Sequence, residues 1–508
     1  MTMELGSRRI TIEDLVHVAT TDTLVRVSHG AMEQVARARE RVLRLAADGP
    51  PIYGLNSALG ANTGAKLAPA DLQAYQRRAV RARALAVGPP YDSVSVRAMQ
   101  FARIAGLVQA GSGVSPHVLQ ACVDLLNRRV HPVVPRWGSI GVSDMPLLAH
   151  LALPLFGEGQ AEYQGEVLSG ADALARAGLA PVTLGVKDGL ALFSANAATA
   201  ARGSLVVYDL LQTMDAWLAA IALSYEGFRA NASPLRADTA AARPAAGQVA
   251  VATRLRQLLA GGQLLAPGNA RRVQDPLSFR VVAQVHGAAQ AAADAARTEI
   301  EVELNSAADS PLVMADENLM LSTGNFHLPA TALALDSCAI ALAQMASMGV
   351  SRCQRFMNPA LTDLPSQLTR HGPAHSGFTP IQKTLVVLWA EIRQRANPGC
   401  LDYMPVSEAI EDHACMSLSV AEKLAESLQR ARYLIAIELI IAAQAVDLRG
   451  TDRAQLGHGA RQAYDKVRAL VSMLDEDRSM GPDIELICSA VADGAFSQLQ
   501  TGSVSSIP

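Results

Sequence analysis

The sequence has few aromatic residues, no closely spaced cysteine pair and little net charge. Aromatic side chains make up 4% of its 508 residues, whereas apolar residues make up 50%, and the excess is alanine and leucine, which favour helices. The formal net charge is −3 and lysine and arginine do not cluster, which argues against nucleic acid as a partner. A chain of this length buries a stable core without disulfides or structural metals.

The scattered cysteines and histidines do not suggest a disulfide framework or a metal site. None of the six cysteines forms a Cys-x-x-Cys pair, and the first residues lack the apolar centre of a signal peptide, so we expect a reducing cytoplasm and no metal. No uninterrupted apolar run reaches the length of a membrane span. The nearest, residues 431–446, is short and contains Glu438. We therefore expect no membrane partner, and helix faces that pack against other helices, including those of sister subunits.

Apolar residues recur at helical spacing over long segments, which predicts an all-α protein built around a long antiparallel helix bundle. The segments are 190–225, 282–300, 329–350, 378–396 and 414–446. Residues 71–127 predict two helices that meet near 87–92, and residues 146–155 predict a short apolar helix. The N-terminal part, 1–200, is richer in loops than 201–508, and we expect the two parts to form one continuous fold.

Polar residues gather with glycine and proline in the loops between these helices. The loops are 50–67, 137–145, 268–280, 303–312, 322–329 and 402–413. Binding and catalytic groups usually lie on such loops, so we expect a small molecule to bind there.

In their order along the chain, these stretches resemble the motifs of the histidine/phenylalanine ammonia-lyase family, the aromatic amino acid ammonia-lyases and aminomutases. The matching stretches are YGLNSALG, QRRAVRARALAVG, LVQAGSGVS, LNRRVHPVVPRWGSIGVSDMPLLAHLAL, KDGLAL, QDPLSFRVVAQVHG, ELNSAADSPLV, STGNFH and IEDHACMS. Each alone is a weak signal. Together, in this order, they identify the chain as a divergent member of the family.

The resemblance implies an ammonia-lyase-like helical homotetramer whose active site gathers loops from three subunits. It also implies a substrate, an α-amino acid that loses or migrates its amino group. The family uses an electrophile, 4-methylidene-imidazol-5-one, which forms when an Ala-Ser-Gly tripeptide cyclises and loses water. Loops facing this group then supply a base and donors that stabilise charge.

This chain departs from the family at the tripeptide itself. Val142-Ser143-Asp144 stands where Ala-Ser-Gly is expected, and the stretch is one residue short, so the glycine is either deleted or replaced by Asp144. A side chain at the attacking nitrogen and a β-branched residue at the carbonyl both hinder ring closure. Either these three residues form the cofactor or there is none, in which case Ser143 and Asp144 cap the helix that starts near Pro146.

Two further departures lie near the cofactor position. Leu277 replaces a family tyrosine, and Ser194 replaces an asparagine, with Asn196 two residues later. Because the expected substrate-carboxylate partner, Arg280, is retained, the pattern indicates a changed reaction step rather than a decayed protein.

The resemblance also assigns roles to side chains. Tyr53 is implied as the base that removes the β-proton, with anchoring of its loop as the alternative. Arg280 is implied to hold the substrate carboxylate in a bidentate pair, with a structural salt bridge as the alternative. Glu411 is implied to receive or orient the amine, with a solvated acidic loop as the alternative. The remaining predicted site residues are Asn196, Gln274, Asn305 and Phe326.

Substrate choice depends on Arg83. Ala82 and Arg83 occupy the pair of positions that separates histidine users from phenylalanine or tyrosine users in the family. An arginine in that pocket favours a polar or anionic side chain over a bare phenyl ring, whereas a surface-facing Arg83 says nothing about substrate.

The sequence therefore predicts a carbon–nitrogen lyase that eliminates or migrates the α-amino group of a small amino acid. Two alternatives remain open at this stage. One is a family member without the methylidene-imidazolone that works by side-chain acid/base chemistry, and the other is a non-catalytic homologue that binds an amino acid.

Overall fold

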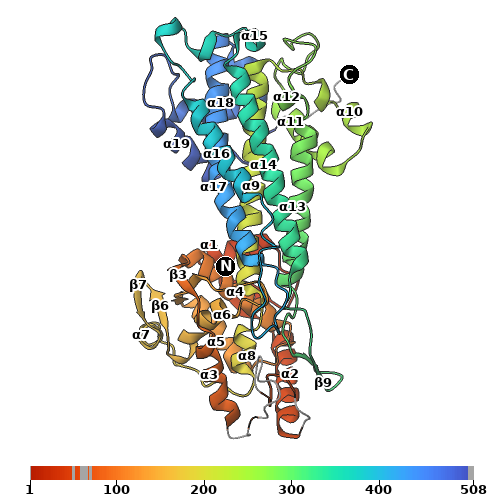
Figure 1. The fold of residues 1–508 in the computed structure, drawn as a ribbon, viewed down its shortest axis with the longest axis vertical. Helices are drawn as coiled ribbons and strands as arrows, with labels where there is room; N and C mark the ends of the chain where they lie inside the picture. The colour runs from red at the N-terminus through yellow and green to blue at the C-terminus, as the bar shows by residue number, and fades with distance from the viewer. Residues whose placement is uncertain (1, 49–51, 58–66, 68–70, 502–508) are drawn as a thin grey trace. The chain divides into compact units, whose positions relative to one another are not determined.

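The computed structural model describes residues 2–48, 52–57, 67 and 71–501. Its residues form two compact units. Unit 1 consists of Met1–Tyr208, Ala296–Leu335 and Pro398–Glu422, and unit 2 of Asp209–Ala295, Asp336–Asn397 and Lys423–Pro508. Four long helices have residues in both units (Figure 1): α9 (Ala197–Phe228), α13 (Val282–Leu304), α14 (Pro329–Phe356) and α17 (Ser417–Arg449).

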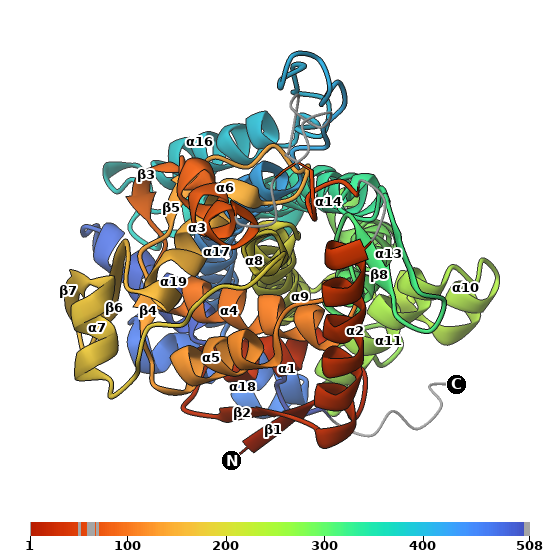
Figure 2. The ribbon, with the colours of Figure 1, turned by 90° about the horizontal axis from the view of Figure 1, so that it is seen from below.

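Unit 1 combines short helices with small sheets. Its helices are α1 (Ile12–Thr20), α2 (His29–Asp48), α3 (Leu72–Arg83), α4 (Ser93–Val108), α5 (Pro116–Asn127), α6 (Met145–Ala152), the 3₁₀ helix η3 (Leu153–Phe156), α7 (Gly170–Arg176) and α8 (Asp188–Phe193). Helix α4 is buried over most of its length and packs between α1 and α5, as Figure 2 shows. Asp92 begins α4 by accepting the Ser95 amide at 2.8 Å, which satisfies one of the unpaired first-turn donors.

Nine short strands form the sheets of unit 1 among the residues that are described. They are β1 (Thr2–Leu5), β2 (Leu24–Val27), β3 (Val87–Pro90), β4 (His131–Pro132), β5 (Pro135–Trp137), β6 (Gln160–Tyr163), β7 (Glu166–Ser169), β8 (Leu312–Met314) and β9 (Leu319–Leu321). Strands β1 and β2 pair in parallel, with Thr2 opposite Leu24. The other pairs, β3 with β5, β4 with β6, β6 with β7, and β8 with β9, are antiparallel.

Unit 2 is helical throughout its described residues. Its further elements are η4 (Ser233–Leu235), α10 (Ala237–Ala241), α11 (Ala246–Leu259), α12 (Leu277–Arg280), α15 (Pro359–Thr362), η5 (Ser366–Leu368), η6 (Gly372–Ala374), α16 (Ile381–Arg395), η7 (Arg453–Gln455), α18 (His458–Leu470) and α19 (Gly481–Ala492). A polar network lies inside it: Glu438 of α17 accepts from Arg352 of α14 and from Trp217 of α9. Because all three side chains are buried, this network fixes how α9, α14 and α17 pack.

The predicted all-α class and the long helices are confirmed, with two differences. Residues 71–127 form three helices and strand β3 rather than two helices, because the second predicted helix is divided into α4 and α5 at residues 109–115. Ala110 and Gly113 there have positive φ values, of +63° and +66°, which a helix does not allow. The predicted helix 190–225 is broken into α8 and α9 at residues 194–196. This break leaves the Ala195 carbonyl outside both helices and available to another loop.

Two helical stretches are long and apolar enough to cross a membrane by length and composition alone. They are Asp188–Phe228 and Pro329–Phe356, whose most apolar windows are 67% and 56% buried inside the protein. The uninterrupted-run criterion missed both, because polar residues are scattered along them. Core helices of a bundle have the same composition, so these two stretches are weak support for a membrane span.

Candidate active site

The loop of residues 138–144, which we call the Ser143 loop, is joined to a distant segment of unit 1. The Ser143 amide donates to the Phe326 carbonyl at 3.2 Å, and Val142 pairs with His327 in an isolated antiparallel bridge. Ser143 is 5% exposed and has φ of +56°, a left-handed conformation that is uncommon for residues other than glycine. Of the predicted site residues, the fold thus brings together Val142, Ser143 and Phe326.

Gly141 lets this loop approach the start of α17. At its φ of +80°, a Cβ atom would lie 2.8 Å from the Ser417 amide nitrogen, so a side chain does not fit. The Cys415 thiol donates to the Gly141 carbonyl at 3.2 Å, and the Met416 amide donates to the Ile140 carbonyl at 2.9 Å. The Ser143 loop is therefore held between residues 326–327 and residues 415–417.

Asp144 is completely buried, and both its side chain and its amide are hydrogen-bonded. Its carboxylate accepts from the Ser139 hydroxyl at 2.7 Å, the Thr199 amide at 2.7 Å and the Thr199 hydroxyl at 3.0 Å. Its own N–H donates to the Ala195 carbonyl at 2.7 Å. Burial raises the pKa of Asp144, and the hydrogen bonds from Ser139 and Thr199 oppose that rise. The carboxylate thus satisfies donors in the first turn of α9, where no helical carbonyl reaches them.

Asn196 precedes α9 and faces a second acidic side chain. Its amide nitrogen donates to the Glu303 carboxylate at 3.1 Å, while its oxygen, also buried, has no hydrogen-bond partner among the described residues. Burial raises the pKa of Glu303 to about 7, and the Asn196 hydrogen bond opposes this. The pair therefore combines an amide oxygen that has no partner among the described residues with a carboxyl group whose pKa is raised by burial.

Glu411 lies in an irregular segment of unit 1. The same segment contains His413, which contacts His327 and Tyr403. The Glu411 backbone pairs with Val406 in an isolated bridge, and the Glu411 side chain is half-buried. Two residues later, His413 Nδ1 lies 2.8 Å from His327 Nε2, and the His413 ring lies 5.0 Å from that of Tyr403. The sequence analysis did not predict this histidine pair. The NFH and EDH motifs contain both histidines, but nothing in the sequence shows that they meet.

Tyr53 and Arg83 lie on the outer part of unit 1. Tyr53 sits in the turn of residues 53–56 and is 38% exposed. Residues 58–66, the rest of its glycine-rich loop, lie outside the described residues. Arg83 ends α3 and is half-buried, with its guanidinium 5.0 Å from the centre of the Phe193 ring. Since Phe193 is the last residue of α8, Arg83 packs over the element that leads into Asn196.

Arg280 and Gln274 belong to unit 2. Arg280 ends α12, is half-buried, and its guanidinium has no hydrogen-bond or ion-pair partner among the residues that the structure describes. An unpaired guanidinium of this kind is able to take a carboxylate in a bidentate pair. Gln274 is exposed in the segment that precedes α12.

Asn305 is occupied by backbone groups. Its side-chain oxygen accepts the Ile10 amide at 2.8 Å, and its nitrogen donates to the Ile10 carbonyl at 2.8 Å and the Glu301 carbonyl at 2.7 Å. These contacts tie the segment before α1 to the end of α13.

A buried charged cluster that was not predicted lies behind α8. Lys187 is completely buried and donates to the Ser112 carbonyl at 2.5 Å, and burial lowers its pKa to about 8. Arg103 and Asp309 form an ion pair at 3.2 Å. The KDG motif marked the position of Lys187, but its burial depends on how α8 packs against α3 and α6.

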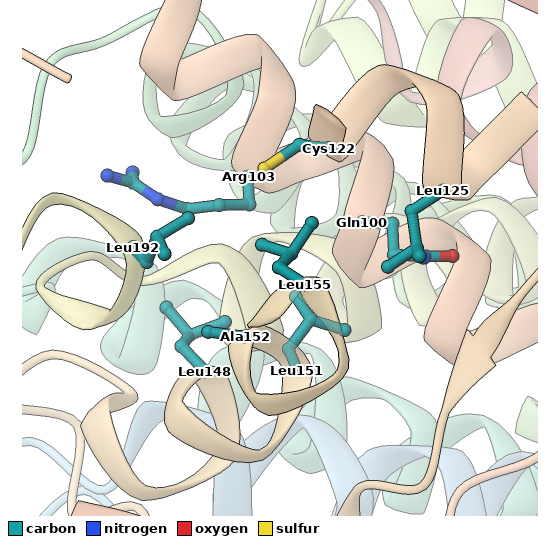
Figure 3. A pocket seen from close by; sticks show the side chains of 9 residues that line it. All are labelled: Gln100, Arg103, Cys122, Leu125, Leu148, Leu151, Ala152, Leu155 and Leu192. Carbon is teal, nitrogen blue, oxygen red and sulfur yellow. The ribbon is translucent and has the colours of Figure 1, made fainter. Parts of the chain in front are cut away.

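A mostly apolar cavity adjoins this cluster. Figure 3 shows leucines of α6, η3 and α8 facing Cys122 and Leu125 of α5, with Arg103 and Gln100 of α4 at its sides. Burial raises the pKa of Cys122 to about 12, so this thiol is a poor nucleophile. None of the predicted site residues lines this cavity. Among the described residues, no group of three or more histidine, cysteine, aspartate or glutamate side chains is placed to hold a metal ion.

The fold and this site define a helical carbon–nitrogen lyase. Residues 10–469 match the family described as "Aromatic amino acid lyase", and the chain belongs to that family. It is 38% identical to the histidine ammonia-lyase of Symbiobacterium thermophilum over 97% of each chain.

Solved structures agree with this family. An ergothioneine-degrading enzyme, ergothionase, from Treponema denticola superposes with a TM-score of 0.95 at 31% identity, covering 98% of this chain and all of the other. Tyrosine aminomutase from Streptomyces globisporus superposes with a TM-score of 0.92 at 30% identity, covering 99% of this chain and 100% of the other. The chain is therefore a lyase that eliminates an amino group, and the methylidene-imidazolone is typical of its family.

Proposed function

We propose that this protein is a carbon–nitrogen lyase that works without the methylidene-imidazolone, on a substrate whose amine leaves readily by itself. The observation that carries the proposal is Asp144, the residue after Ser143, whose side chain and amide are both engaged by other parts of unit 1.

Ring closure would require the Asp144 amide nitrogen to attack the Val142 carbonyl carbon. That N–H instead donates to the Ala195 carbonyl at 2.7 Å, and the buried carboxylate is tied to Ser139 and Thr199. Turning the amide toward Val142 would break these hydrogen bonds inside the protein, where unsatisfied polar groups cost about 1–3 kcal/mol each. The residues present therefore do not fit the cofactor.

The same contacts favour deletion of the glycine over its replacement. In the family motif an aspartate follows Ala-Ser-Gly directly, and Asp144 is followed by MPLLAH as that aspartate is followed by LAPLAH. A buried carboxylate at the start of α9 is a structural role that suits such an aspartate. The cyclising glycine then has no counterpart in this chain.

Without an electrophile, the nature of the leaving amine decides which substrates react. An electrophile that adds to nitrogen needs a lone pair there, which a quaternary ammonium group lacks. A quaternary group also leaves as a neutral tertiary amine and needs no activation. We propose an α-trimethylammonium carboxylate with a polar side chain as the substrate class. The similarity to an ergothioneine-degrading enzyme supports this class.

The predicted site residues keep their roles in this proposal. Tyr53 removes the β-proton, Arg280 holds the carboxylate, and Arg83 faces a polar or anionic side chain. Asn196, Gln274, Phe326 and Glu411 complete the site. Asn305, whose side-chain atoms are bound to the backbone of Ile10 and Glu301, supports it by joining the segment before α1 to the end of α13. As the family resemblance implies, we propose that the site is completed in a cytoplasmic homotetramer, where loops of different subunits meet.

The first test is the intact mass of the purified protein. We expect the full mass of the translated chain, because cyclisation would remove two waters. A mass lower by two waters would overturn the proposal and restore a cofactor-dependent ammonia-lyase as the function.

The second part of this test is turnover. We expect trimethylamine release from ergothioneine or from the trimethyl betaine of histidine, and no ammonia release from L-histidine. Tyr53→Phe is expected to lose this activity, by about 10²-fold or more if the hydroxyl transfers the proton. Ammonia release from L-histidine by full-mass protein would contradict the proposed substrate class.

Replacing Arg280 by methionine tests the carboxylate clamp. We expect KM to rise by about ten-fold or more, because a charge-assisted pair to a carboxylate contributes about 1.5–3 kcal/mol, with a smaller change in kcat. Arg272→Met is the matched control, since Arg272 lies on the same segment and its guanidinium already donates to the Ala360 carbonyl. An unchanged KM in Arg280→Met would assign Arg280 to structure instead.

A further inference from the structure

His327 and His413 form a hydrogen-bonded pair beside the Ser143 loop. His327 Nε2 lies 2.8 Å from His413 Nδ1, and the ring planes are nearly perpendicular, at 88°. The other nitrogen of His327, Nδ1, lies 3.4 Å from the Gly141 carbonyl oxygen. Both histidines and Gly141 belong to unit 1. The hydrogen bonds between Gly141 and His327 and between His327 and His413 therefore lie within a single unit.

The Gly141 carbonyl determines which nitrogen donates in each hydrogen bond of the pair. A carbonyl oxygen only accepts, so Nδ1 of His327 carries the hydrogen and its Nε2 accepts in the neutral ring. His413 Nδ1 therefore donates to His327, which leaves the lone pair of His413 on Nε2. When that nitrogen takes a proton, the His413 to His327 hydrogen bond becomes charge-assisted and stronger. The same arrangement of base and orienting group is found in nucleophile–base–orienter triads.

The pair lies beside the Ser143 loop and is not part of the packed core. The His413 side chain is exposed and His327 is half-buried, so neither is needed to fill a packed interior. His327 pairs through its backbone with Val142, directly before Ser143.

The polar groups around the pair are few. Glu411 and Asp412 precede His413 on its own segment, the Tyr403 ring lies 5.0 Å from that of His413, and the Cys415 thiol donates to the same Gly141 carbonyl. The groups on the Ser143 loop that touch the pair are backbone atoms.

We propose that His413, positioned by His327, accepts the proton that the elimination removes and passes it to solvent. This inference rests on the proposed function. In the elimination Tyr53 takes the β-proton, the Cβ–H electron pair forms the Cα=Cβ bond, and the Cα–N electron pair leaves with the tertiary amine. One proton then remains in the site in each turnover. It moves to His413 Nε2 and from there to water, which leaves the pair neutral for the next cycle.

Chemical rescue separates this role from a structural one. We expect His413→Ala to lower kcat by about 10²-fold with a smaller change in KM, and added imidazole to restore a large part of kcat in proportion to its concentration. His327→Asn is expected to lower kcat by a smaller factor, because His413 remains as the proton acceptor but loses its orienting partner. His29→Asn is the matched control, as His29 lies on α2 with its side chain 90% exposed.

The results for the histidine variants test the proton relay, whereas trimethylamine release by the wild-type enzyme tests the proposed function. Loss of kcat without rescue by imidazole, or wild-type kcat in His413→Ala, would overturn the relay while trimethylamine release by the wild-type enzyme still stands. A second readout needs no turnover: a hydrogen-bonded imidazole N–H proton resonance is expected in the wild type and its loss in His327→Asn. Absence of that resonance in the wild type would overturn the pairing itself.

Discussion

Replacing Arg352 by methionine is expected to lower the free energy of unfolding by about 3–5 kcal/mol. Arg352 and Glu438 are both fully buried and joined by two hydrogen bonds, of 2.7 and 3.0 Å. Glu438 also accepts from the Trp217 indole at 2.9 Å and the Ser224 hydroxyl at 3.0 Å. Removing the guanidinium leaves a buried carboxylate without its counter-charge, and that uncompensated charge is the source of the loss. Denaturant unfolding followed by circular dichroism measures it.

Two companion variants show that burial causes the effect. Arg176→Met removes a surface pair with Glu166, whose side chains are 54% and 63% exposed, and is expected to change stability by less than about 1 kcal/mol. The double variant Arg352→Met with Glu438→Leu is expected to regain part of the loss, because it removes both charges. An effect of Arg352→Met as small as that of Arg176→Met would show that the buried network does not hold α14 against α17.

Under the proposed function, restoring the family tripeptide is expected to create an electrophile that the natural sequence does not form. Val142→Ala, combined with a glycine inserted between Ser143 and Asp144, gives Ala-Ser-Gly followed by the buried aspartate. The new glycine supplies an amide that need not pair with Ala195, while Asp144 keeps its contacts with Ser139 and Thr199. Intact mass spectrometry is expected to show a loss of two waters that the unmodified chain does not show.

The control for this experiment is Ser143→Ala in the restored chain, which removes the hydroxyl that is lost as water and is expected to give the full mass of that variant's chain. If the restored chain with Ser143 also keeps its full mass, the absence of cyclisation has a cause other than the missing glycine. The explanation from Asp144 would then be wrong.

Much of the architecture could be predicted because helical periodicity is local. The apolar spacing of 282–300, 329–350 and 414–446 predicted α13, α14 and α17. The structure extends α13 and α14 at their C-terminal ends, and both ends of α17 lie three residues later than predicted. The prediction failed at residues 194–196, where Ser194 and Asn196 interrupt an apolar pattern that continues on both sides. In the sequence, two polar residues within so long an apolar pattern were too weak a signal to predict that the helix breaks there.

The sequence could propose residues for the candidate site but not the contacts that they make. Motif order identified Ser143, Asn196, Arg280 and Glu411 as residues to examine. It did not reveal that Asp144 reaches Thr199, or that His327 meets His413, because these partners are 55 and 86 residues apart.

The amino-acid sequence by itself determined the helical class and the family, because both depend on local spacing and on motifs of a few residues. The tertiary structure alone decided what Asp144 does. The hydrogen-bond partners of a carboxylate depend on which donors the fold places near it. Here the donors are Ser139 and the first turn of α9. These contacts, which hold the Asp144 side chain at the start of α9, are the basis of the proposal that the backbone at Ser143 does not cyclise.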